Sequence, residues 1–169
     1  LSKLKCTYVV IGHSERRALL GETHADVATK AQRALAVGLG VIVCVGETLA
    51  QREGGETESV IGAQIDAIAA LAAKADPARF VVAYEPVWAI GTGKTATPEQ
   101  AQDVHAAIRA RLDRAGAPAD RIRLLYGGSV KPASAQALFR IADIDGGLIG
   151  GAALVADDFA AICRAAVPA

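Results

Sequence analysis

The sequence predicts an α/β fold that forms part of a (β/α) barrel, and three observations support this class. Apolar runs recur along the chain, alanine-rich helical patterns separate them, and glycine or polar residues follow nearly every run. Apolar strands that alternate with helices are typical of parallel sheets covered by helices. Because functional-looking residues follow several strands and not one switch point, the pattern favours a barrel rim over an open doubly wound sheet.

The apolar runs mark the expected strands, and the segments between them show the three-and-four spacing of amphipathic helices. The expected strands are Tyr8–Ile11, Val41–Val45, Phe80–Tyr84, Arg123–Tyr126 and Leu148–Ile149. The expected helices include Val27–Ala36, Ser59–Ala72, Pro98–Arg114 and Ala133–Phe139. Turn residues separate these units and no stretch has linker composition, so we expect a single domain over residues 1–169 with about five βα units.

The composition excludes several function classes. The 169 residues are 52% hydrophobic, and 18 Lys and Arg balance 18 Asp and Glu, so no net charge attracts nucleic acid or an anionic membrane. No apolar stretch reaches the ~20 residues that span a bilayer, and the first residues lack a signal-peptide layout, so we expect a cytoplasmic protein. Cys6, Cys44 and Cys163 lack metal-site spacing; we expect each to be a small buried side chain, with Cys44 behind Glu85.

The stretch from the third expected strand to the next helix carries the most informative pattern. The strand ends in a single carboxylate, Glu85, directly before Pro86, which cannot continue a strand ladder. An apolar loop over Val87–Ala96 follows, and Thr97 then opens a helix with a proline and a capping-box glutamine. The pattern indicates a catalytic base beneath a lid. On the local pattern alone, the alternative is that Glu85 caps a turn and Trp88 is a core residue.

Two glycine pairs follow the last two expected strands. Gly127-Gly128-Ser129 comes directly after Tyr126, and Gly150-Gly151 opens an expected short helix. Free backbone N–H groups at a helix start favour an anion, and the late strand ends of a (β/α) barrel are its common phosphate site. We therefore expect phosphate to bind here, although a double glycine alone usually marks a tight turn.

His13 follows the first expected strand, and Ser14–Arg17 then begins a helix. Taken alone, this histidine is either satisfied by a backbone group or is an electrophile whose imidazole stays neutral beside the positive end of the helix dipole.

The remaining polar residues receive structural interpretations. We expect His24 to be solvated, His105 to lie in packing or at the surface, and Glu47 to brace helix starts and neighbouring loops.

These segments together resemble the triosephosphate isomerase family. The resemblance is carried by Ile11-Gly12-His13-Ser14-Glu15-Arg16-Arg17, Val43–Thr48, Val81–Ala96, Tyr126–Val130 and Asp145–Gly151. It covers essentially the whole chain and implies a (β/α)8 TIM barrel, of which this chain carries the strands similar to the family's fourth to eighth. It further implies an isomerase of glycolysis and gluconeogenesis that interconverts dihydroxyacetone phosphate and glyceraldehyde 3-phosphate through an enediolate. The family needs no cofactor or metal, and the complete protein is expected to be a homodimer.

The resemblance also implies roles for individual residues. Glu85 is implied to be the catalytic base, and a neutral His13 to donate a hydrogen bond to the substrate carbonyl. The residues implied to bind the substrate phosphate are Gly91, Ser129, Gly150 and Gly151. Those implied to support the site or the lid are Ser14, Glu15, Trp88 and Tyr126, with Tyr126 and Ser129 holding the lid closed. Ser134 and Val155 replace the family's common asparagine and lysine outside the reacting centre.

The chain is short for this family. Because a (β/α)8 barrel takes about 250 residues, we expect roughly 80 residues to be missing at the front, as three βα units. The family carries an asparagine and a catalytic lysine in that part, and the absence of methionine fits a chain that begins within the protein. Two alternatives stay open: a non-catalytic partial barrel and, less favoured by the lid motif, another phosphate-binding barrel enzyme.

Overall fold

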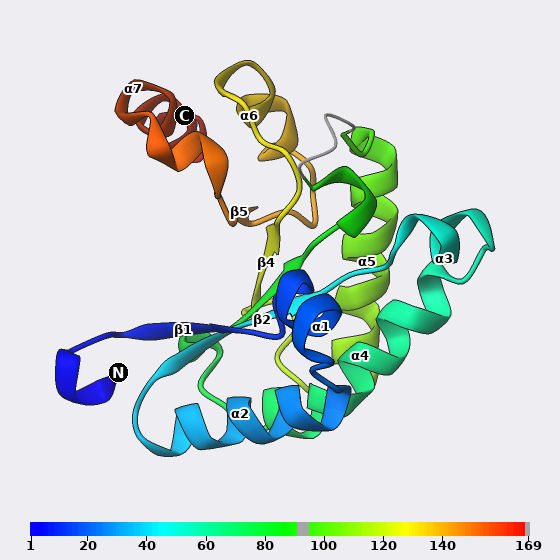
Figure 1. Ribbon diagram of the computed structural model, residues 1–169, viewed down its shortest axis with the longest axis vertical. Helices are drawn as coiled ribbons and strands as arrows, with labels where there is room; N and C mark the ends of the chain where they lie inside the picture. The colour runs from blue at the N-terminus through cyan, green and yellow to red at the C-terminus, as the bar shows by residue number, and fades with distance from the viewer. Residues whose placement is uncertain (91–94, 168–169) are drawn as a thin grey trace.

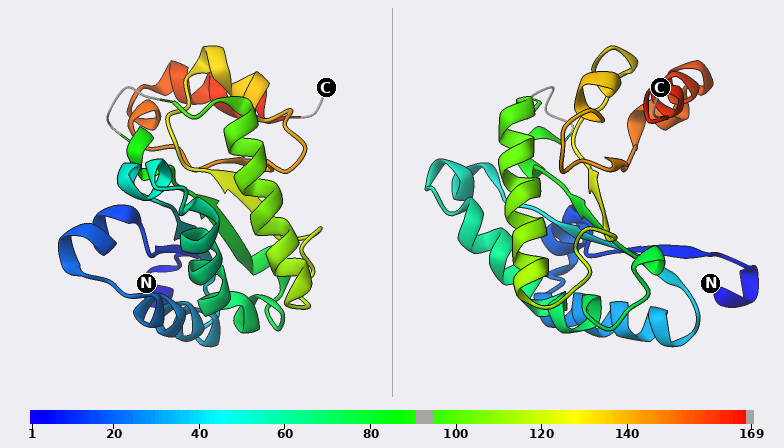
Figure 2. Two further views of the ribbon diagram at one scale, coloured as in Figure 1. Left: turned by 90° about the vertical axis from the view of Figure 1, so that its right-hand side faces the viewer. Right: turned by 180° about the vertical axis from the view of Figure 1, so that it is seen from behind.

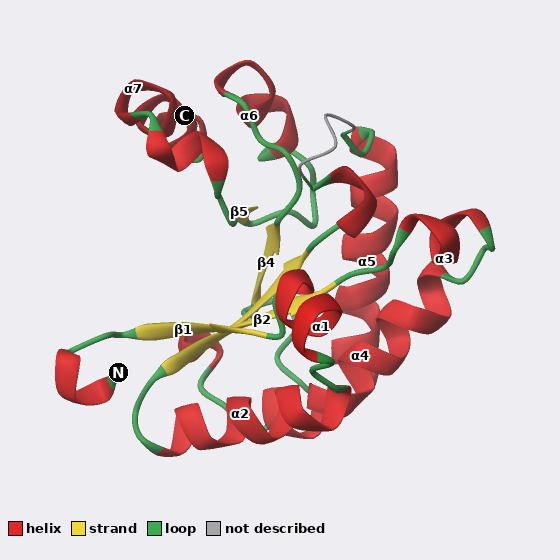
Figure 3. Ribbon diagram, in the orientation of Figure 1, coloured by secondary structure: helices red, strands yellow, loops and turns green. Residues whose placement is uncertain are grey.

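The computed structural model describes residues 1–90 and 95–167, and its strands form one parallel sheet (Figure 1). In spatial order the five strands are β1 (Tyr8–Ile11), β2 (Gly40–Val45), β3 (Phe80–Tyr84), β4 (Arg123–Tyr126) and β5 (Gly146–Gly147). Spatial order equals chain order, and helices lie in each connection between neighbouring strands (Figure 3). A parallel pair needs such a crossover, so the alternating strand and helix pattern of the sequence is confirmed.

The first four predicted strands are confirmed, with β2 beginning one residue earlier than expected. The fifth prediction, Leu148–Ile149, is wrong, because the strand lies over Gly146–Gly147. Its partner explains the difference: Tyr126 is the last residue of β4 and aligns with Gly147. The ladder therefore ends before Leu148, which keeps a hydrogen bond of 3.0 Å to the carbonyl of Tyr126.

The helices follow the predicted order and add two that the periodicity did not indicate. They are α1 (Ser14–Leu20), α2 (His24–Ala36), α3 (Leu49–Glu53), α4 (Thr57–Ala72), α5 (Pro98–Arg114), α6 (Pro132–Leu138) and α7 (Ala156–Ala165). Helix α3 is too short to show a helical period, and α7 follows the 3-10 turn Gly151–Leu154, which matches the short helix expected to open at Gly150. The side chain of Thr23 accepts the N–H of Asp26 and caps α2. The first turn of α2 therefore forms before Val27, where the predicted apolar pattern begins. The predicted capping box of Thr97 and Gln100 is confirmed.

Helices α2, α4 and α5 cover one face of the sheet (Figure 2). On that face the side chains of Val43, Val82 and Leu124 lie in register across β2, β3 and β4, and all are buried. One row further toward the carboxyl ends, Tyr84 and Tyr126 are paired and buried as well. The core therefore extends up to the edge of the sheet where the predicted site residues follow the strands.

The sheet is open. Within the described ranges β1 and β5 each pair with a single strand, and on β1 the residues Tyr8 and Val10 are 38% and 41% exposed. In a closed barrel the first and last strands pair, which leaves no such edge. The molecule is a five-stranded segment of a (β/α) barrel. Among the described helices, none has both the length and the apolarity to cross a membrane.

Only one of the three cysteines has the predicted burial. Cys44 is buried, whereas Cys6 and Cys163 are exposed, so the expectation for these two is wrong. Cys6 precedes the open edge strand β1, and on α7 the neighbouring Ile162 takes the buried position. An apolar neighbourhood in sequence does not tell which side of an amphipathic helix or edge strand a residue occupies.

Candidate active site

Glu85 directly follows β3 and is 2% exposed. Its Oε2 accepts a hydrogen bond of 2.9 Å from the backbone N–H of Ser14, and its Oε1 lies 2.9 Å from Nε2 of His13. Burial raises the pKa of the Glu85 carboxyl, and His13 and the Ser14 N–H oppose that shift. A buried carboxylate with a raised pKa is a stronger base than an exposed one, as proton abstraction requires.

His13 is the N-cap residue of α1, and its two ring nitrogens face different groups. Nδ1 accepts a hydrogen bond of 3.3 Å from the backbone N–H of Glu15, so the ring proton is on Nε2, which faces Glu85. The two interpretations left open by the sequence are therefore compatible: the backbone satisfies one nitrogen, and the other faces Glu85 in the cleft. Glu15 contributes its backbone here, while its side chain is exposed at the edge of the cleft.

Cys44 lies behind Glu85, as predicted, and its contact with the carboxylate partly opposes the rise that burial causes in the pKa of Glu85. Burial raises the pKa of the Cys44 thiol far above its ordinary value, and the charge of Glu85 adds to that shift. The thiol therefore stays protonated and acts as a donor to the carboxylate. This contact fits the predicted packing role.

Glu47 anchors the start of the predicted lid. This fully buried carboxylate accepts hydrogen bonds of 3.0 Å at Oε1 from Tyr84, Trp88 and Arg52. The guanidinium of Arg52 also lies 4.8 Å from the ring centroid of Trp88. The expectation that Glu47 braces loops is confirmed, and its partners show that it fixes Trp88, which lies in the 3-10 turn Val87–Ala89, two residues beyond Glu85.

A cleft of about 820 Å³ opens at the carboxyl ends of the strands. Its lining includes His13, Glu85, Ile90, Ser129, Gly150 and Gly151. The structure thus brings together predicted residues from four separate connections of the chain. Gly91 was also predicted for phosphate, and it lies outside the described residues. A second cavity of about 280 Å³ between α4 and α5 contains none of the predicted site residues.

The glycines around the cleft serve two different needs. A Cβ at Gly127 would lie 3.0 Å from Cγ of Glu85, and one at Gly128 would overlap the hydroxyl of Tyr126, so both permit close packing. Gly150 and Gly151 face open space, with no atom within 4 Å of a built Cβ. Packing does not require glycine at this second pair, and the bare backbone there leaves N–H groups accessible to a ligand.

Tyr126 and His105 form a buried aromatic layer below the cleft. The ring centroid of His105 lies 5.6 Å from that of Tyr84 and 6.3 Å from that of Tyr126. His105 is fully buried, and its Nδ1 lies 2.7 Å from the carbonyl of Ala101. Of the two positions predicted for His105, in packing or at the surface, the first is therefore correct. Burial raises the pKa of Tyr126, and the backbone of Ala96, at the end of the lid segment, opposes that shift. His24 is exposed, as predicted.

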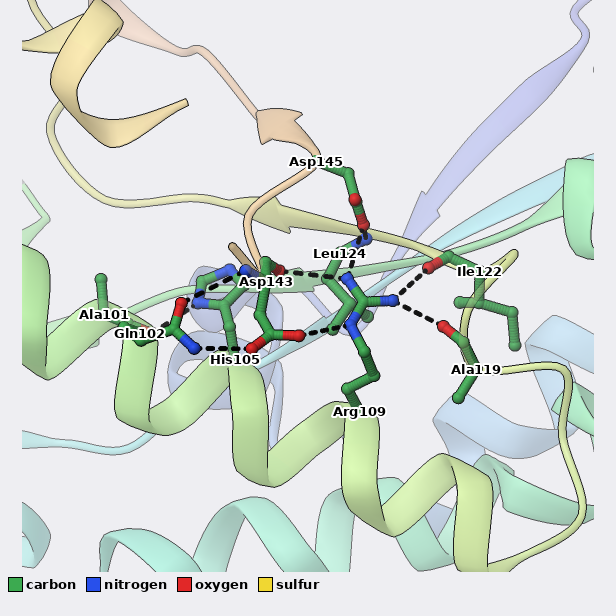
Figure 4. A network of polar contacts seen from close by, with 9 residues as sticks. All are labelled: Ala101, Gln102, His105, Arg109, Ala119, Ile122, Leu124, Asp143 and Asp145. Carbon is green, nitrogen blue, oxygen red and sulfur yellow. Dashed lines mark hydrogen bonds and ion pairs between the residues drawn. The ribbon is translucent and has the colours of Figure 1, made fainter. Parts of the chain in front are cut away.

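A polar network that the sequence did not reveal fixes the strands beneath the glycine pairs (Figure 4). Arg109 on α5 donates to Asp143 at 2.7 Å and to Asp145 at 2.9 Å, and Asp145 accepts the backbone N–H of Leu124 on β4. Burial alone would raise the pKa of Asp143, but hydrogen bonds from Gln102 and Arg109 hold it below its ordinary value. The network ties α5 to the segment between β4 and β5; Gly127 and Gly128 open that segment, and Gly150 and Gly151 lie just beyond β5.

These features define a partial (β/α)-barrel protein with a carboxylate, an imidazole and glycine-rich loops at the carboxyl ends of its strands. The family model described as triosephosphate isomerase matches residues 1–166. The chain belongs to the triosephosphate isomerase family.

Three curated relatives named triosephosphate isomerase are similar over nearly the whole chain. The protein of Herminiimonas arsenicoxydans is 61% identical over 167 residues, which cover 98% of this chain and 67% of the relative. That of Thiobacillus denitrificans is 62% identical over 162 residues, covering 95% and 65%, and that of Ralstonia nicotianae is 60% identical over 166 residues, covering 98% and 67%. The chain spans about two thirds of the length of these relatives.

Proposed function

We propose that this chain supplies the proton-transferring and phosphate-binding parts of a triosephosphate isomerase, which interconverts dihydroxyacetone phosphate and glyceraldehyde 3-phosphate. The observation that carries the proposal is the contact between Glu85 Oε1 and His13 Nε2, 2.9 Å apart, at the carboxyl ends of two strands. The glycine pairs line the same cleft. A base, a hydrogen-bond donor and an anion site in one cleft are the parts that this reaction requires.

Glu85 and His13 act in sequence on the substrate. The Glu85 carboxylate takes a proton from the carbon next to the carbonyl, the electrons of that C–H bond form the double bond of an enediolate, and charge develops on the carbonyl oxygen. His13 donates its Nε2–H to that oxygen, which replaces Glu85 as the acceptor. Return of the proton from Glu85 to the neighbouring carbon, with transfer of a proton between the two oxygens, gives the isomer. The step needs no cofactor or metal.

The phosphate group binds at Ser129, Gly150 and Gly151, with Gly91 as a further contact outside the described residues. The open space in front of Gly150 and Gly151 supports this assignment. Trp88 anchors the lid at its start through Glu47, and Tyr126 lies beside Ala96 at its end. Tyr126 and Ser129 hold the lid closed over the substrate, which excludes water from the enediolate.

Residues 1–169 form one partial-barrel domain. The enzyme to which this domain belongs is cytoplasmic, and the complete enzyme is a homodimer. Its partner is a small phosphorylated substrate, with no role for nucleic acid or membrane. The open edges β1 and β5 favour a second candidate for the chain alone, a non-catalytic partial barrel. The two candidates differ in whether the missing strands restore turnover.

An isomerase assay on two proteins tests the proposal. One is this chain alone; the other, called the joined barrel, places the part of the Herminiimonas arsenicoxydans relative that this chain does not cover ahead of residue 1. We expect turnover from the joined barrel and its loss in the joined barrel carrying Glu85→Gln. Full turnover with Glu85→Gln would reject Glu85 as the base. A folded but inactive joined barrel would reject the proposed function.

A further inference from the structure

Strand β2 extends further toward the site than its neighbour β1. Ile11 is the last residue of β1 and aligns with Val43 of β2. The chain continues past that point through Cys44 and Val45 to Gly46. These residues lie beside the site, but β1 no longer runs next to them to complete the ladder.

The direction of the Gly46 backbone follows from its neighbours. The carbonyls of Val45 and Glu47 accept hydrogen bonds from the N–H groups of Glu85 (2.7 Å) and Val87 (3.2 Å), on the β3 side. Alternate residues of a parallel strand bond to opposite neighbours. Gly46 therefore directs its own N–H and C=O to the other side, where β1 has ended.

The side chain of Gln64, on α4, satisfies both groups. Its Oε1 accepts the N–H of Gly46 at 2.8 Å, and its Nε2 donates to the carbonyl of Gly46 at 2.9 Å. The reverse amide orientation would oppose donor to donor and acceptor to acceptor, so these contacts fix the carboxamide. Gln64 is 6% exposed. Its carboxamide takes the place that a residue of a longer β1 would occupy.

Gly46 in turn lies against the backbone of Glu85. A Cβ at position 46 would overlap the carbonyl oxygen of Glu85 and would lie 3.4 Å from its Cβ. There is no free space between the two backbones, so a displacement of Gly46 displaces Glu85. The hydrogen bond from Glu85 N–H to Val45 reinforces this coupling.

We propose that Gln64 is a positioning residue for Glu85: its carboxamide holds the Gly46 backbone, and Gly46 sets the position of the catalytic base. The inference rests on the proposed role of Glu85. It assigns Gln64 no contact with substrate. Its effect is confined to β2 and β3, whereas the proposed phosphate site lies beyond β4 and β5.

The test compares three variants of the joined barrel. Gln64→Met removes both hydrogen bonds at similar size, Gly46→Ala pushes on Glu85 directly, and Ile68→Val is the control, a buried change on the same helix away from Gly46. Because a small misplacement of a reacting group can cost about 10²-fold, we expect kcat to fall about 10- to 100-fold in the first two, with KM little changed. The double variant should be no worse than the poorer single variant, since both act through one contact.

A pH profile separates positioning from general packing. In Gln64→Glu the ionised carboxylate cannot donate to the Gly46 carbonyl, but the protonated acid can both donate and accept, as the amide does. The ratio of its kcat to that of the unsubstituted joined barrel should therefore rise as the pH falls. A pH-independent ratio would mean that the Gly46 contact does not govern the base.

Hydrogen exchange gives a readout that does not depend on turnover. In Gln64→Met the N–H groups of Glu85 and Val87 should exchange faster, while that of Gly127, which donates to Tyr84 at 2.7 Å, should not. Unchanged exchange at Glu85, or a kcat equal to that of Ile68→Val, would overturn the inference. If Gln64→Met is normal while Glu85→Gln is inactive, only this inference fails; if Glu85→Gln is active, the proposed function fails.

Discussion

Trp88 donates its indole N–H to the buried carboxylate of Glu47, which lies 41 positions earlier in the chain. Glu47 follows β2 and Trp88 follows β3, so the bond joins two neighbouring connections at the rim. The same oxygen accepts the hydroxyl of Tyr84, the last residue of β3. The start of the proposed lid is therefore fixed to the strand that positions Glu85.

Trp88→Phe should loosen the lid while leaving the reacting groups in place. The change removes the donor to Glu47 at 3.0 Å and keeps an aromatic ring. A lid that closes less well lets the enediolate phosphate escape and eliminate phosphate, so phosphate released per turnover should rise. The matched control is Tyr84→Phe, which removes another donor of 3.0 Å from the same oxygen outside the lid. Equal ratios in the two variants would count against an anchoring role for Trp88.

Glu85→Gln should lower turnover of the joined barrel by about 10²–10⁴-fold, the usual contribution of a positioned general base. The amide oxygen can still accept the Ser14 N–H, so the local fold should persist. Inhibition by inorganic phosphate should change little, because the proposed phosphate site lies beyond other strands. Parallel loss of turnover and phosphate binding would indicate a folding defect in place of a lost base.

The same variant makes a second prediction about pH and stability. Burial raises the pKa of Glu85 from its ordinary 4.5, so the folded protein holds this proton where the unfolded chain has released it. The stability from this group is full below about pH 4.5 and is lost as pH rises through the folded pKa, at ~1.4 kcal/mol for each pH unit between the unfolded and the folded pKa. In urea unfolding, the free energy of unfolding of Glu85→Gln should therefore rise relative to that of the unsubstituted joined barrel as the pH rises. A constant difference at all pH values would contradict the raised pKa.

Features of the fold and the site could be predicted from the sequence where neighbouring residues in the chain determine them. Glu85, His13 and the glycine pairs could be placed at strand ends because apolar runs stop at glycine or proline there. The last strand was misplaced because its extent depends on β4, a property of the partner.

Contacts between side chains on different helices, strands and loops could not be predicted from the sequence. Gln64 lies 18 positions from Gly46 and Arg109 lies 34 from Asp143, and no local pattern specifies such pairs. Glu47 could be predicted as a brace from its place after a strand, but its partner Trp88 could not. Packing of helices on the sheet decides these contacts, and it becomes known only with the register and the helix faces.

Arg109→Ala should destabilise the joined barrel by about 1.5–3 kcal/mol, because hydrogen bonds to charged groups are lost and carboxylates remain without a partner. Arg109 donates to Asp143 and Asp145, and its side chain is 20% exposed. Arg111→Ala is the control, since its paired Asp66 is 57% exposed and such surface pairs contribute little. Urea unfolding should show a much larger shift for Arg109→Ala than for Arg111→Ala. Equal shifts would mean that the network of Figure 4 does not stabilise the segment between β4 and β5.

This chain alone should be inactive, and the missing strands should restore activity when supplied separately. Its five strands leave β1 and β5 with one neighbour each, and a barrel set for eight strands cannot close on five. Exposed apolar residues such as Val10 on β1 and Leu154 near α7 should make the isolated chain associate. The measurement is an isomerase assay on the purified chain, with and without the uncovered part of the Herminiimonas arsenicoxydans relative as a second polypeptide. Activity only in the mixture would establish a split barrel, because base, histidine and glycine pairs come from this chain and closure comes from the other. Strong activity from the chain alone would show that three further βα units are not needed.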